Sequence, residues 1–159
     1  MHYNVIVTAE IEQNVTKPSG DAIAQQILST ILGSSTKIIS EGTLSSSKDG
    51  RITLKFKSTN DRDNEISFSK SEPELISFRR GETSFQEPVI VFLEEGKRHR
   101  CINKGAGGER IEFTTSTEQL ENKLLKSGKM TISYFIEVCG VRVESTKIRI
   151  SVIHDKSKE

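Results

Sequence analysis

The sequence predicts an all-β fold: an antiparallel barrel of about ten strands with one short helix near its N-terminus. Apolar and polar residues alternate along most segments, which is the period of a half-buried strand. Short turn signals separate these segments, as in barrels and sandwiches. The closing hairpin, residues 130–154, changes the parity of its apolar positions within one strand. Such a change requires an extra residue, and a bent strand is what a closing barrel needs.

Length and composition fit one moderately apolar domain. With 159 residues the chain can bury a proper core, so we expect a single domain over residues 1–159. A hydrophobic share of 33% suits a sheet that is wet on one face. The 23 basic and 22 acidic residues leave a net charge of +1. This balance argues against nucleic acid as a partner.

The cysteines and the hydropathy indicate where the protein resides. Cys101 and Cys139 lack disulfide or zinc spacing and are interpreted as small hydrophobic side chains in a reducing compartment. No apolar run approaches the ~20 residues that span a bilayer. The first residues show no signal-peptide pattern. We therefore expect a cytoplasmic protein without membrane contact.

The N-terminal segment predicts one strand followed by the helix. Alternation predicts a strand over 3–12, and a loop follows over 14–20. Within 21–32, isoleucines recur every four residues, and Gly33 stands where a C-terminal cap belongs. We interpret 21–32 as a helix that covers an opening or a flank of the barrel.

A meander of short strands follows the helix. Each strand alternates apolar and polar residues, and the breaks contain turn signals such as Asp49-Gly50 and Glu95-Gly96. Pro88 marks an edge or a bulge, since proline cannot donate to a ladder. The strands are expected over residues 36–45, 52–56, 66–68, 75–79, 89–93, 97–102 and from 111 toward 124.

The closing hairpin is the clearest local pattern. Apolar residues alternate from Met130 to Val138, and Cys139-Gly140 offers a two-residue reversal. The return strand begins with apolar odd positions and ends with apolar even positions. This pattern predicts a bulge or bend within residues 144–147.

Several stretches together carry a resemblance to a known family. They are RRG at 79–81, FLEEGKRH at 92–99, FTTST at 113–117 with Leu120, GKMTISYFIEV at 128–138 with Gly140, and IRISV at 148–152. With these stretches the chain resembles an uncharacterised bacterial family with a calycin-like, lipocalin-like β-barrel, a domain of unknown function. The resemblance covers about residues 75–155 and, more weakly, 36–56. Two features differ from the family pattern: the glycine-rich turn at 104–108, where the family usually has a Thr-Pro-x-Gly-like turn, and the helix at 21–32. The resemblance implies a barrel fold but no activity, because the family has none established.

A basic cluster is the strongest candidate for chemistry. If Glu95-Gly96 is a two-residue turn, Phe92 lies opposite His99, and Arg98 and Arg100 share the other face of the hairpin. Pointing inward, the two arginines could pair with a carboxylate or phosphate of a ligand. Pointing outward, they would keep their heads in water. His99 is either a hydrogen-bonding group of the site or a structural residue.

The expected function follows from the barrel. We expect a non-enzymatic module that binds a small amphipathic or anionic molecule in the barrel interior, through Arg98, His99, Arg100 and Tyr134, with Arg79 as an outer contact. The alternative is a protein-interaction module with a filled barrel, including a homodimer through a sheet edge. No catalytic set, metal-ligand spacing or cofactor motif is visible.

Overall fold

A computed structural model describes residues 1–17, 30–58, 61–81 and 88–158. Its strands are β1 (His2–Lys17), β2 (Thr30–Ser46), β3 (Arg51–Lys57), β4 (Asp63–Ser69), β5 (Glu72–Arg80), β6 (Val89–Glu94), β7 (Arg98–Lys104), β8 (Arg110–Lys123), β9 (Lys129–Val138) and β10 (Val141–His154). The described helices are α2 (Leu124–Ser127) and the 3-10 turn η1 (Lys156–Lys158).

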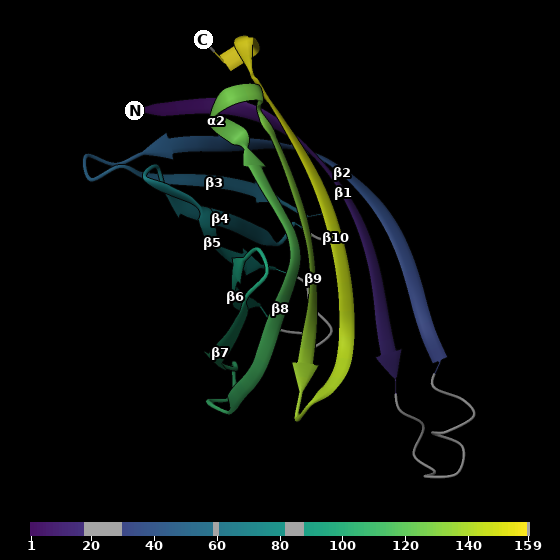
Figure 1. The fold of residues 1–159 in the computed structure, drawn as a ribbon. Coiled ribbons are helices and arrows are strands. Elements are labelled where there is room, and N and C mark those ends of the chain that lie inside the picture. Colours follow the sequence, from purple (N-terminus) through teal and green to yellow (C-terminus); the bar gives the residue numbers. More distant parts are fainter. Residues whose placement is uncertain (18–29, 59–60, 82–87, 159) are drawn as a thin grey trace.

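The ten strands form one antiparallel sheet in the order β6-β5-β4-β3-β2-β1-β10-β9-β8-β7. Figure 1 shows this sheet strongly curved, with α2 and both ends of the chain at the same end of the fold. The expected all-β antiparallel fold of about ten strands is therefore confirmed. Strands that follow each other in the sequence pair with each other, except β6 and β7, which are the two edges of the sheet, and β1 also pairs with β10.

The sheet almost closes at a seam between its two edge strands, β6 and β7. The side chain of Asn103 on β7 replaces a ladder rung, because its Oδ1 accepts from Ile90 N–H (2.9 Å) and its Nδ2 donates to Ile90 O (3.1 Å). On β8, Thr115 donates its hydroxyl to Phe92 O at 2.7 Å. These contacts satisfy backbone groups that an open edge would leave unpaired.

The waist of the barrel is filled by its own side chains. Inward-facing residues alternate along every strand, and most of them are aliphatic or phenylalanine. The largest fully buried side chains are Tyr134, Phe68, Phe78, Phe113, Leu54, Ile66, Ile76, Leu93, Met130, Ile132, Ile136 and Ile148. Among the described residues, these side chains close the middle of the barrel.

The closing hairpin has the predicted turn and a bulge slightly earlier than predicted. Cys139 (φ 51°) and Gly140 (φ 78°) both adopt positive φ, as a type I′ reversal requires. The register shifts between Arg142 and Glu144, so Val143 is the extra residue. The shift lies just before the expected range 144–147. The inward-facing positions of the second half of the strand already begin at Glu144, which is charged and therefore is not counted among the apolar positions.

The predicted helix over 21–32 is wrong at its end. Residues 30–32 belong to β2 and pair with β1, in a ladder that continues to Thr30 opposite Lys17. This pairing overrides the four-residue spacing of the isoleucines, as tertiary context commonly does. Residues 21–29 lie outside the described residues. A one-turn helix, α2, lies before Gly128, whose N–H donates to Leu124 O.

Candidate functional site

The predicted basic cluster lies on the outer surface. The side chains of Arg98 and Arg100 are 60% and 64% exposed, and they pair with Glu137 and Glu112 respectively. His99 is half-buried, with its Nε2 3.3 Å from Glu94 Oε1. The inward orientation considered for the two arginines is therefore wrong, and the outward alternative is confirmed.

The cause is that β6 and β7 do not pair as a regular hairpin. Each strand takes its orientation from its paired neighbour, β5 or β8. On β7, Cys101 pairs with Phe113 of β8 and both are buried. Successive side chains alternate across a strand, so Arg98, Arg100 and Ile102 must face outward. Phe92 also faces outward and is exposed.

The remaining predicted residues divide between the two faces of the barrel wall. Arg79 is exposed, whereas its neighbour Arg80 is buried. Tyr134 is also buried, and Arg80 Nη1 donates to its hydroxyl at 2.8 Å. The structure thus brings together one predicted residue, Tyr134, with two that were not predicted, Arg80 and Glu144.

Glu144 is the centre of this interior cluster. Its Oε2 accepts from Arg80 Nη1 at 2.6 Å and from the Thr146 hydroxyl at 2.8 Å. Its Oε1 accepts from Gln13 Nε2 at 2.6 Å. A buried carboxylate is tolerable only with such partners, because desolvation otherwise costs several kcal/mol.

The pKa values of the cluster follow from burial and mutual contact. Burial opposes the charge on Glu144, but Arg80 and the hydrogen bonds from Thr146 and Gln13 outweigh it and lower the pKa of Glu144. Burial likewise opposes the charge on Arg80, but Tyr134 and Glu144 raise its pKa. Burial raises the pKa of Tyr134 to about 12. The cluster therefore contains an ion pair and a neutral phenol at neutral pH.

A small cavity borders this cluster, and we call it the arginine cavity. Its volume is about 90 Å³. Ser58 Oγ is buried there without a hydrogen-bond partner among the described residues. The cavity is lined by Ile11, Gln13, Ser34, Thr36, Ile38, Phe56, Ser58, Asn64, Phe78, Arg80 and Ile148. At ~30 Å³ per molecule it has room for about three waters.

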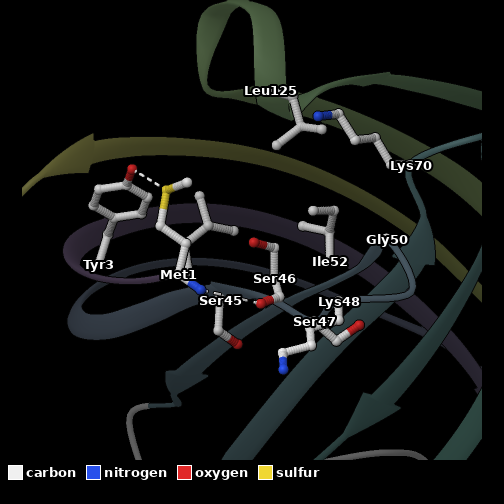
Figure 2. A pocket seen from close by; sticks show the side chains of 11 residues that line it. Met1, Tyr3, Ser45, Ser46, Ser47, Lys48, Gly50, Ile52, Lys70 and Leu125 are labelled. Atoms are coloured by element: carbon white, nitrogen blue, oxygen red, sulfur yellow. Dashed lines mark hydrogen bonds between the residues drawn. The ribbon is translucent and has the colours of Figure 1, made fainter.

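A larger pocket opens at the opposite end of β1, β2 and β3, and we call it the lysine pocket. Its volume is about 380 Å³. It is lined by Met1, Tyr3, Leu44, Ser45, Ser46, Ser47, Lys48, Gly50, Ile52, Lys70 and Leu125. Figure 2 shows Leu125 of α2 on one side and Met1, Ser46 and Ile52 facing it across the opening. The pocket is thus the mouth of the barrel beside α2.

The lysine pocket combines an apolar wall with a cationic rim. Leu44 packs against the core, and Ile52 belongs to it, so the floor of the pocket is apolar. Lys48 and Lys70 are both exposed at its rim, and no acidic residue lines it. Asp49, next to Lys48, accepts instead from the Ser47 hydroxyl and from Arg51 N–H in its own turn.

The sequence contains a signal for the interior cluster but none for the lysine pocket. Arg80 continues the inward parity of Ile76 and Phe78, and Glu144 precedes Ile148 at even spacing, so parity alone could have placed both inside. The lysine pocket instead joins residues from the chain start, the β2–β3 turn, the β4–β5 turn and α2. No local pattern relates these segments.

The described residues contain no group of three or more His, Cys, Asp or Glu side chains that could hold a metal ion. No helix among them has the length and apolar character needed to cross a membrane.

The fold defines an all-β, nearly closed ten-stranded antiparallel barrel. The sequence matches no family model and no curated protein. Among solved structures, it is similar to the crystal structure of ywiB protein from Bacillus subtilis. The TM-score is 0.57 at 12% identity, and the match covers 93% of this chain and 92% of that one. At this identity the likeness shows the fold alone.

Proposed function

We propose that this chain is a non-enzymatic small-molecule-binding module that takes its ligand at the mouth of the barrel. One observation carries the proposal: the lysine pocket has a volume of about 380 Å³ and an apolar floor. Pockets of about 300–1,000 Å³ with apolar walls and a few polar groups are typical of small-molecule sites. The filled waist below it sets the depth that a ligand can reach.

The residues expected to bind ligand change with this placement. Arg98 and Arg100 are engaged with glutamates on the outside, and Tyr134 is held in the interior cluster. We assign binding instead to Leu44, Ile52 and Leu125, with Lys48 and Lys70 at the rim. The ligand would still bind inside the barrel wall, but only at the mouth formed by the lysine pocket.

The test uses the neutral fluorescent probe N-phenyl-1-naphthylamine and one variant that fills the pocket. We expect saturable fluorescence enhancement at one probe per chain. Leu125→Trp should weaken binding at least about tenfold, or ~1.4 kcal/mol, because the indole occupies the opening. Ile102→Trp is the matched control, since Ile102 is 55% exposed on β7 and Leu125 is 48% exposed. Absence of saturable binding, or equal binding by Leu125→Trp, would refute the proposal.

A protein-interaction module is the second candidate, favoured by exposed apolar residues near the seam. Ile90 and Phe92 on β6 and Ile102 on β7 face solvent on the strands that meet there. The edge strands face each other, so a partner would contact this outer surface instead of adding a strand. Light scattering after size-exclusion chromatography tests whether the chain forms a homodimer. Phe92→Ser should cause a dimer formed through this surface to dissociate. A monomer at all concentrations would exclude the homodimer.

Family membership and cellular location are two further proposals. The nearly closed antiparallel barrel and the likeness to a Bacillus subtilis protein support membership of a bacterial calycin-like, lipocalin-like family. Free thiols at Cys101 and Cys139 support a cytoplasmic location, where disulfides are rare. Fractionation of the native host, with detection of the chain in the cytosolic or the secreted fraction, tests the location.

A further inference from the structure

We infer that the ligand of the lysine pocket is an anionic amphiphile: a short apolar chain that ends in a carboxylate or a similar oxyanion. The oxyanion would lie at the rim near Lys48 and Lys70, and the chain would cover Leu44, Ile52 and Leu125. This inference rests on the proposed function and specifies the chemical class of its ligand.

The charge of the rim is one-sided. Two lysines line the pocket and no acidic residue does. Within the described part of the chain, neither Lys48 nor Lys70 forms an ion pair with a carboxylate, as is true of most of the described lysines. An anionic group at the rim would therefore gain attraction without first displacing a protein carboxylate.

Polar groups suited to an oxyanion lie beside the lysines. Figure 2 shows the Ser46 hydroxyl directed into the pocket and the Lys70 side chain extending toward Leu125. A hydroxyl donates one hydrogen bond and an ammonium donates up to three. Lysine is a flexible point charge, so Lys48 and Lys70 can adjust to a headgroup from opposite sides of the opening.

The apolar wall and the volume set the size of the chain. A pocket of about 380 Å³ lies at the small end of the range for small-molecule sites, about 300–1,000 Å³. Decanoate, with ten carbons and two oxygens, is a small probe of the inferred class. A hydroxyl-rich or strongly cationic molecule would leave Leu44 and Ile52 uncovered or face like charges at the rim.

The experiment compares three ligands of equal chain length by titration calorimetry: decanoate, decan-1-ol and decyltrimethylammonium. We expect decanoate to bind about tenfold tighter than decan-1-ol, since two exposed ion pairs contribute modestly. The ammonium compound should bind most weakly. Raising the salt concentration should weaken decanoate binding and leave decan-1-ol unchanged.

Variants separate the headgroup from the pocket. The double variant Lys48→Met and Lys70→Met should abolish the preference for decanoate while keeping decan-1-ol binding. The matched control is Lys37→Met with Lys104→Met, two exposed lysines that do not line the pocket. The control should retain the preference.

The outcomes distinguish the two proposals. If decan-1-ol binds as tightly as decanoate in the wild type and salt has no effect, the anionic class is wrong and the binding function stands. If none of the three binds or competes while the fluorescent probe still binds saturably, the anionic class is wrong and the binding function stands. If the probe does not bind saturably either, the binding function fails as well. If the double variant does not fold, the salt dependence of the wild type decides the question.

Discussion

Arg80 on β5 and Glu144 on β10 form an ion pair across the full width of the barrel, with 2.6 Å between Nη1 and Oε2. In the sheet order, four strands separate β5 from β10 in one direction, and four more separate them in the other direction, through the seam. The pair therefore joins opposite walls. Both side chains are buried, 6% and 0% exposed, so the pair is shielded from solvent screening.

Glu144→Gln should destabilise the fold strongly. The variant leaves the Arg80 guanidinium buried opposite a neutral amide, and breaking a buried pair in this way costs about 3–5 kcal/mol. Denaturation in urea, monitored by circular dichroism, measures the free energy of unfolding. A loss below about 1 kcal/mol would show that the pair does not support the barrel.

Two controls identify the unpaired charge as the cause. Arg80→Met combined with Glu144→Leu should be more stable than Glu144→Gln alone, because no buried charge remains. The folded pKa of Glu144 lies below its ordinary value of 4.5. Its contribution is therefore present above the unfolded pKa and disappears as the pH falls through the folded one. The difference between wild type and Glu144→Gln should shrink on acidification.

Tyr134 should make stability depend on alkaline pH. Burial raises its pKa from 10.0 to about 12, so between these values the unfolded chain has lost the phenolic proton and the folded chain retains it. The folded state then binds more protons, and stability falls as the pH rises, by up to ~1.36 kcal/mol per pH unit for this group. Tyr134→Phe should lack this part of the slope between pH 10 and 12. Urea denaturation at several pH values measures the free energy of unfolding. If it fell equally with pH between 10 and 12 for the wild type and for Tyr134→Phe, the prediction would be wrong.

Alternation along the strands allowed the barrel to be predicted. The period of two identifies which residues share a face, and turn residues such as Asp49-Gly50 and Cys139-Gly140 separate the strands. Alternation is local, however, and does not identify which strand lies on the other side of an edge. Alternation therefore predicts a regular hairpin of β6 and β7, a pairing that the closed sheet does not use. It also leaves open whether Arg98 and Arg100 face inward or outward.

The interior cluster was missed for a different reason. A charged side chain on a strand is normally taken to face solvent, because an isolated charge is costly to bury. Arg80 and Glu144 avoid this cost by pairing with each other, at a separation of 64 residues along the chain. Nothing local to either residue shows that its partner exists. The same holds for the lysine pocket, where Lys48, Lys70 and Leu125 meet only in the folded barrel.

Replacing Asn103 should open the seam. Asn103→Leu removes both hydrogen bonds to Ile90 and leaves that backbone unit without them, at a cost of about 1–3 kcal/mol. The Ile90 amide should then exchange with deuterium faster than in the wild type, which mass spectrometry of peptides from β6 can measure. Asn4→Leu is the control, since Asn4 is an exposed strand residue away from the seam. Unchanged exchange in β6 would show that Asn103 does not close the barrel.

Gly42 should tolerate no side chain, because β2 and β3 approach closely at this point. A Cβ there would lie 2.4 Å from Lys55 O and 3.0 Å from Val7 Cγ2. Both neighbours belong to paired strands, so relief requires moving the backbone, and overpacking of this kind costs about 1–3 kcal/mol. Gly107→Ala is the matched control, because its Cβ would meet the flexible end of Glu109, and such surface changes stay within about 0.5 kcal/mol. Thermal denaturation should separate Gly42→Ala from this control. If both variants melt with the wild type, β2 and β3 are not packed as closely at Gly42 as the ladder between Gly42 and Phe56 implies.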